Sequence, residues 1–147
     1  MTRIGSLLGL LMLSACGGEE GPPLSAGGAR IFAPLPGTDA AVGYLTIENR
    51  TAAAIKLDTF ESPDFDRVEL HETDTRDDIV RMRRLDALVI PPKDGVSLVE
   101  NGKHFMLIGP RGPAAPGRRI TLRLGQEGAA LIVIEADMRD RFPDNLN

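Results

Sequence analysis

Short strand-forming segments separated by dense turn residues constrain the fold of this chain more than any other feature. Proline, glycine, asparagine and aspartate punctuate a series of segments rich in β-branched and other apolar residues. The expected strands are residues 29–33, 42–48, 54–60, 67–72, 79–83, 95–100, 103–109, 120–124 and 130–137. No stretch carries a sustained helical apolar period with caps. Regularly spaced short strands in about 110 residues predict a single all-β domain, an antiparallel β-sandwich.

One turn signal is specific enough to predict a pairing. Asn101-Gly102 lies between an apolar run at residues 96–99 and the segment 103–109. Asn-Gly is typical of a two-residue hairpin turn, since both residues tolerate positive φ. We therefore expect these two segments to pair as a β-hairpin.

The side chains best suited to a soft metal ion gather in one region. The chain has two histidines, His71 and His104, and two of its five methionines, Met82 and Met106, lie in the same stretch. In a strand, residues i and i+2 share a face, so His104 and Met106 can contact one ion from a single strand. His71 and Met82 must then come from neighbouring strands.

The chemistry of this set favours copper. Imidazole nitrogen suits copper and zinc, whereas thioether sulfur favours Cu(I). Two thioethers without a carboxylate or thiolate would make a poor site for zinc, magnesium or calcium. The alternative is structural, because a strand methionine usually fills the core and a lone histidine is usually hydrogen-bonded.

The spacing H-x10-M-x21-H-x-M, from His71 to Met106, resembles the signature of the PCu(A)C-type periplasmic copper chaperones. Neighbouring text is also similar: GYLTIEN, VELHE, VRMR, the IPP turn and HFMLIG. The resemblance covers roughly residues 30–137. It implies a cupredoxin-like fold with His71 and His104 supplying nitrogen, and Met82 and Met106 supplying sulfur, to one Cu(I) ion.

The resemblance also implies a function. Such a protein carries Cu(I) without turnover to the copper centres of respiratory oxidases, typically in cytochrome c oxidase assembly. The partner would be an oxidase subunit or a thioredoxin-like assembly factor. Family members often carry a second methionine directly after the first histidine, where this chain has Glu72. Some members have a His/Met-rich tail, whereas this chain offers only Met138, which gives little support for a second copper site.

The first 15 residues have the architecture of a secretion signal. Arg3 precedes an apolar run at residues 4–13, which is shorter than the roughly 20 residues that a bilayer requires. Leu13-Ser14-Ala15-Cys16 resembles a bacterial lipobox. We expect Cys16 to be lipidated and to anchor the protein on the periplasmic side of a bacterial membrane. The glycine after Cys16 weakly favours the outer membrane.

The remaining chain divides into three expected parts. Residues 16–29 are rich in glycine, proline and serine and predict a flexible tether that reaches roughly 20 Å. Residues 30–138 form the expected copper-binding domain, and residues 139–147 form a C-terminal tail.

Cysteine usage and charge exclude several classes of function. Cys16 is the only cysteine, so once acylated it leaves the domain without a thiol. A blue-copper electron-transfer site, which needs cysteine with two histidines, is therefore excluded. The net charge is −4, from 17 basic and 21 acidic residues, which argues against a nucleic-acid binder. Arg81, Arg83 and Arg84 around Met82 are interpreted first as a solvated face and second as a docking patch for a copper acceptor.

Other functions stay open at this point. The same site could serve copper storage or tolerance, or it could be vestigial in an envelope interaction lipoprotein. An enzyme is not expected, since the chain has no Ser/His/Asp or Cys/His arrangement and no histidine to spare as a base.

Overall fold

The structure is a computed structural model that describes residues 21–141. Its strands are β1 (Leu24–Phe32), β2 (Ala40–Asn49), β3 (Ile55–Leu57), β4 (Thr59–Glu61), β5 (Phe65–Arg76), β6 (Ile79–Leu85), β7 (Leu88–Ile90), β8 (Gly95–Ser97), β9 (Lys103–Pro110), β10 (Arg119–Gln126) and β11 (Ala129–Arg139). No helix occurs in this described part of the chain, so the all-β prediction is confirmed. Accordingly, residues 21–141 contain no helix that could cross a membrane.

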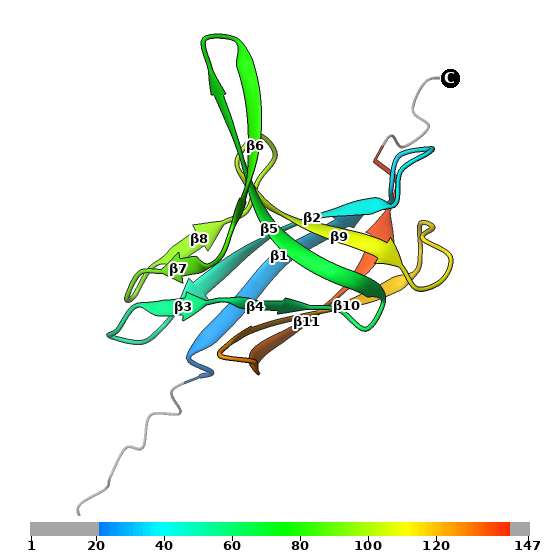
Figure 1. The fold of residues 1–147 in the computed structure, drawn as a ribbon. Coiled ribbons are helices and arrows are strands. Elements are labelled where there is room, and N and C mark those ends of the chain that lie inside the picture. Colours follow the sequence, from blue (N-terminus) through cyan, green and yellow to red (C-terminus); the bar gives the residue numbers. More distant parts are fainter. Residues whose placement is uncertain (1–20, 142–147) are drawn as a thin grey trace, which may run out of the picture.

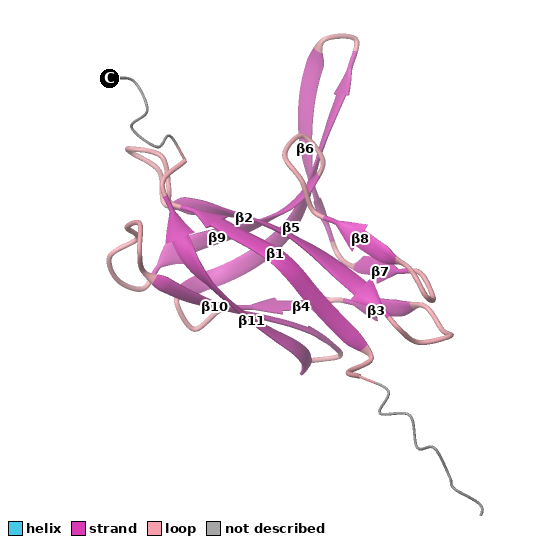
Figure 2. Ribbon diagram, turned by 180° about the vertical axis from the view of Figure 1, so that it is seen from behind, coloured by secondary structure: helices cyan, strands magenta, loops and turns pink. Residues whose placement is uncertain are grey.

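The strands form a cupredoxin-like sandwich, as expected. One hydrogen-bonded sheet runs in the order β4-β10-β11-β1-β2-β9-β5-β6, with β8 added to β2, and β3 and β7 form a separate pair. This sheet folds over itself, so that β4, β10 and β11 lie below β2, β9 and β5 (Figure 1). The view from behind shows β1 crossing between the two layers (Figure 2). The pairing is not purely antiparallel, because β1 and β11 run parallel.

The hydrophobic core fills the space between the layers. β9 contributes Phe105 and Leu107, and β10 contributes Leu122 and Leu124, all of them fully buried. The ring of Phe105 lies 5.2 Å from that of Phe60 on β4, which joins the two layers directly. Fully burying one such side chain stabilises the fold by roughly 1.5–3 kcal/mol. These inward residues fix which residues of β9 must face outward.

The folded domain begins earlier in the chain than the sequence analysis expected, which leaves fewer residues for a tether. Leu24 already pairs with Asn49 of β2 and is buried, so residues 24–29 belong to the domain and not to a linker through residue 29. Glycine favours a flexible coil, but here Gly28 has φ +63° and forms a bulge where the β1–β2 register shifts. Ladder hydrogen bonds and the burial of Leu24 offset the entropy cost of the glycines. The expected signal peptide, residues 1–15, and Cys16 lie outside the described residues. The expected tail begins inside β11, which ends at Arg139, and residues 142–147 are not described.

The expected hairpin at Asn101-Gly102 is only partly present. A tight turn forms, with Asn101 at φ 60° and the Val99 N–H donating to the Lys103 carbonyl at 2.8 Å. However, β8 pairs with β2 and not with β9. The reason is that β9 pairs with β2 only along residues 40–43 of β2, so residues 46–48 of β2 can pair with β8.

Two further differences concern strand limits. The expected strand 54–60 divides at Asp58 into β3 and β4, whose partners are β7 and β10 respectively. The short strand β7 has no counterpart in the sequence prediction. The Asp58 carboxylate accepts a hydrogen bond from the Glu127 N–H at 2.9 Å, which ties this break to the β10–β11 turn.

Candidate metal centre

The β5–β6 hairpin projects well beyond the rest of the sheet (Figure 1). Its two turn residues, Asp77 and Asp78, have φ 51° and 59°, and Arg76 pairs with Ile79 across the turn. Positive φ at both central residues defines a type I′ turn, which matches the twist of the flanking strands. The hairpin therefore extends several residues further than the expected segments 67–72 and 79–83.

Strand register places the four predicted ligands on one face. His71 lies opposite His104 in the β5–β9 ladder, and Met82 lies opposite Thr73 in the β5–β6 ladder. Residues two apart share a face, as do residues directly opposite each other. His71, Thr73 and Met82 are therefore on the same face as His104 and Met106. This face is the outer one, since the intervening residues Leu70 and Phe105 enter the core.

A cavity of about 340 Å³ opens on this face. Met82, His104 and Met106 all line it, together with Leu35 and Tyr44. His71 does not line the cavity. The centroid of its ring is 6.0 Å from that of His104, so the structure brings three of the four residues to one cavity and the fourth beside it.

The four side chains differ in exposure. His104 is buried at 5 % exposure, whereas Met82, on the projecting hairpin, is 55 % exposed. Met106 and His71 are half-buried. The arrangement therefore has a fixed side on β9 and an accessible side on β6.

Each histidine has one ring nitrogen engaged by an acceptor. His71 Nε2 lies 2.9 Å from Glu69 Oε2, and His104 Nδ1 lies 3.0 Å from the Gly102 carbonyl. His71 Nδ1 is buried and has no hydrogen-bond partner among the described residues. A buried polar atom without a partner is costly and calls for an explanation, of which a bound ion is one. A bound metal ion would satisfy it.

Glu69 is a functional candidate that the sequence reasoning missed. It lies two residues before His71 on the same face of β5, which is the signal that could have found it. Its Oε1 contacts Arg67 Nε at 3.2 Å and Arg84 Nη1 at 3.4 Å. The hydrogen bond from His71, aided by these guanidinium groups, holds the pKa of Glu69 below its usual range.

Tyr44 is a second residue that the sequence reasoning missed. Its ring lies 6.4 Å from that of His104 and 5.9 Å from that of Phe32. Burial raises the pKa of Tyr44. Val42, two residues earlier, lies opposite Met106, which puts Tyr44 on the site face. These aromatic contacts support His104 from the β2 side.

The donor set suits a soft ion. Two imidazoles and two thioethers share a face, and no group of three or more His, Cys, Asp or Glu side chains that could hold a metal occurs within residues 21–141. Zinc and calcium sites are built from such groups. The residues present fit Cu(I), for which thioether and imidazole are suitable ligands.

The arginines of β6 are divided between the two faces of the hairpin. Arg83 and Lys103 bind Glu72, whose pKa these hydrogen bonds lower, on the face away from the cavity. Arg84 binds Glu69 on the site face. Because opposite charges are paired and split between two faces, the interpretation as a solvated face fits better than a docking patch.

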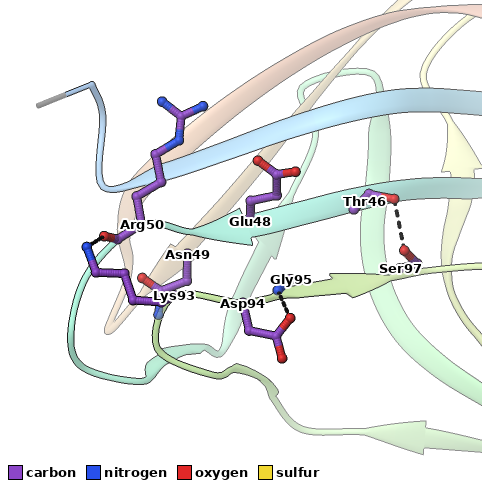
Figure 3. A pocket seen from close by; sticks show the side chains of 8 residues that line it. All are labelled: Thr46, Glu48, Asn49, Arg50, Lys93, Asp94, Gly95 and Ser97. Carbon is purple, nitrogen blue, oxygen red and sulfur yellow. Dashed lines mark hydrogen bonds between the residues drawn. The ribbon is translucent and has the colours of Figure 1, made fainter.

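A larger pocket lies elsewhere and offers different chemistry. It has a volume of about 540 Å³ and lies along the paired strands β2 and β8 and the residues that precede β8 (Figure 3). Its lining is polar, including the Thr46–Ser97 hydroxyl pair at 3.0 Å and Lys93, whose Nζ donates to the Arg50 carbonyl at 2.6 Å. No histidine or methionine lines it, so the soft-metal chemistry belongs to the smaller cavity.

Comparison with known proteins agrees with this fold. The model of the LpqE-like lipoprotein family matches residues 24–138. The copper-bound PCuAC domain from PmoF2 is 24 % identical with a TM-score of 0.58, over 82 % of this chain and 94 % of that one. The Cu(I) form of DR1885 from Deinococcus radiodurans is 23 % identical with a TM-score of 0.64, over 85 % of this chain and 84 % of that one. At these identities the likeness is one of fold. No curated protein matches the chain.

Proposed function

Since this chain belongs to the LpqE-like lipoprotein family, we propose that it is a lipid-anchored copper chaperone that carries one Cu(I) ion. The ligands are His71, Met82, His104 and Met106. Copper is the cargo of this site and not a resident cofactor. Two of the structures that share the fold are described as copper-bound and Cu(I)-bound, which supports copper as the ion.

The observation that carries the proposal is the buried Nδ1 of His71, which lies beside His104 and has no hydrogen-bond partner within residues 21–141. It lies on the face that also holds both thioethers. A purely structural histidine would be expected to have both ring nitrogens satisfied or solvated. Two nitrogens and two sulfurs can hold Cu(I) in a distorted tetrahedron without any change of charge on the ligands.

The unequal exposure of the ligands favours transfer over storage. His104 is buried on β9, whereas Met82, in the middle of β6, is open to solvent. An acceptor that offers thiolates or imidazoles can therefore replace Met82 first while β9 still holds the ion. A storage site would instead be expected to bury all of its ligands.

The acceptor that we propose is a copper centre of a respiratory oxidase, as in cytochrome c oxidase assembly, reached directly or through a thioredoxin-like factor. Lipidation of Cys16 would hold the domain at the periplasmic side of a bacterial membrane, and the remaining tether, now residues 16–23, would keep it near membrane-bound partners. The protein would act without catalytic turnover and would not bind nucleic acid.

The test is an anaerobic Cu(I) titration against a chromogenic competitor, using the chain from residue 17 to 147, which contains every described residue. One tight equivalent with mixed nitrogen and sulfur scattering in X-ray absorption is expected. No competitive binding, or a shell made only of oxygen, would contradict the proposal. Mixing the loaded protein with a soluble oxidase copper domain then tests delivery against storage.

A further inference from the structure

Glu69 constrains the tautomer of the His71 ring. A carboxylate can only accept hydrogen bonds, so the 2.9 Å contact between Glu69 Oε2 and His71 Nε2 requires the proton to be on Nε2. In the neutral ring the lone pair is then on Nδ1. That atom is the buried one without a partner in the described part of the chain.

His104 is held in the opposite sense. Its Nδ1 lies 3.0 Å from the Gly102 carbonyl, which can only accept, so the proton is on Nδ1 and the lone pair is on Nε2. Gly102 belongs to the Asn101-Gly102 turn that precedes β9. Two histidines that lie directly opposite each other in one ladder therefore offer different nitrogens.

We propose that Glu69 is a positioning residue that makes His71 bind copper through Nδ1, while His104 binds through Nε2. Outer hydrogen bonds of this kind fix the tautomer and ring orientation of metal-binding histidines. The inference rests on the proposed function, because it assumes that both histidines are ligands.

The surroundings of Glu69 show that its orientation is fixed. Its Oε1 contacts Arg67 and Arg84, which leaves Oε2 directed at His71. Arg84 is the residue opposite His71 in the β5–β6 ladder, so the contact is set by strand register. Binding through Nε2 would break the Glu69 hydrogen bond and still leave Nδ1 buried without a partner.

The choice of ring nitrogen changes where a bound metal would lie. Nδ1 is adjacent to the Cβ-bearing carbon of the ring, so a metal bound there lies closer to β5 than a metal bound at Nε2 would. His104, bound through Nε2, reaches further from β9. His71 itself does not line the cavity that Met82 and Met106 share.

The experiment uses Ag(I), a d10 ion like Cu(I) whose nucleus couples to a directly bonded nitrogen. The full mature chain, labelled with the heavy nitrogen isotope at histidine, is loaded with Ag(I) and its nuclear magnetic resonance couplings are assigned. The expected result is one coupling to His71 Nδ1 and one to His104 Nε2. A coupling to His71 Nε2 would overturn the inference while leaving the proposed function intact. No coupling to either histidine would overturn the proposed function itself.

Variants isolate the role of Glu69. Glu69→Ala is expected to lower Ag(I) affinity about 10- to 100-fold and to weaken or move the His71 coupling. Glu69→Gln keeps an acceptor oxygen and should restore the Nδ1 coupling. The matched control is Glu72→Ala, which removes the carboxylate next to His71 on the other face of β5 and should change neither coupling. An unchanged Nδ1 coupling and affinity in folded Glu69→Ala would overturn the role assigned to Glu69.

Discussion

His71 and His104 lie directly opposite each other in the β5–β9 ladder, with ring centroids 6.0 Å apart and planes inclined at 42°. The sequence separates these residues widely, yet one antiparallel register brings their rings together on the outer face. The same register puts Glu69 opposite Met106. A shift of the register by one residue would turn His104 and Met106 into the core and Phe105 out of it. The burial of Phe105 therefore favours the register that keeps His104 and Met106 on the outer face.

Removing a thioether from the site should weaken copper binding without unfolding the domain. Met106→Leu keeps the volume of the side chain and removes the sulfur, so we expect Cu(I) affinity to fall by at least about tenfold, or about 1.4 kcal/mol. Met138→Leu is the matched control, because Met138 is buried in the core on β11 and should leave affinity unchanged. Competitor titrations of both variants measure the difference. Equal affinities would mean that Met106 is not a ligand.

Acid should release the metal. Histidine binds metal only as the neutral imidazole, so protons compete with Cu(I) at both rings. We expect the affinity to fall as the pH is lowered from about 8 to about 5, measured with a competitor whose own titration is known. Thioethers do not titrate in this range. An affinity that stayed flat would therefore rule out histidine ligation.

Asp58 should stabilise the fold only above acid pH. Its carboxylate accepts the Glu127 N–H, and mainly for this reason its pKa is lowered. At a pH between the lowered pKa of the folded state and the unfolded pKa of about 3.9, the unfolded chain binds more protons than the folded chain. The stabilisation by Asp58 is therefore full above the unfolded pKa and is lost as the pH falls through the folded pKa. Asp58→Asn should therefore be less stable than wild type at neutral pH, with the difference shrinking below about pH 4. Urea unfolding at several pH values measures it, and a difference independent of pH would contradict it.

The turn of the β5–β6 hairpin carries a cost that glycine should remove. Asp77 and Asp78 both have positive φ, which side chains with a Cβ adopt unfavourably, although aspartate tolerates it. Asp78→Gly should raise the free energy of unfolding by up to about 1 kcal/mol. The control is Asp74→Gly inside β5, where the backbone is extended and glycine should destabilise. Urea unfolding distinguishes the two, and a loss of stability in Asp78→Gly would show that the turn is not strained.

The arginines on the far face of the hairpin should not steer copper transfer. Arg83 is paired with Glu72, and Arg81 lies opposite Asp74, so the far face does not present a block of one charge. The double variant Arg81→Glu/Arg83→Glu should keep both the transfer rate to an acceptor and its dependence on salt. Stopped-flow transfer at several salt concentrations tests this. A transfer rate that lost its salt dependence would restore the docking patch.

Much of the candidate site could be foreseen from residue types and spacing. The two-residue period along residues 103–109 predicted that His104 and Met106 share a face, and the structure adds that Phe105 and Leu107, on the other face, are buried in the core. The contact of Glu69 with His71 was missed although the two residues lie two apart on one strand face, since a glutamate at that spacing is common in solvated strands. Tyr44 was missed because it is far from His104 in the sequence and carries no local signal of that contact. The Asn101-Gly102 turn formed, yet its strand β8 paired with β2, because pairing depends on which ladder positions other strands leave free.

The sequence by itself determined the all-β class, the shared face of His104 and Met106 on β9 and the soft donor set, because these follow from side-chain chemistry and from the two-residue period of a strand. Tertiary structure alone decided that His71 meets His104, that Met82 is carried on a projecting hairpin, and that Leu24 begins a strand beside β2. It also decided which nitrogen of each histidine contacts an acceptor. These properties depend on contacts between segments far apart in the chain, and the free energy of such contacts is fixed only when the strands choose their partners and register.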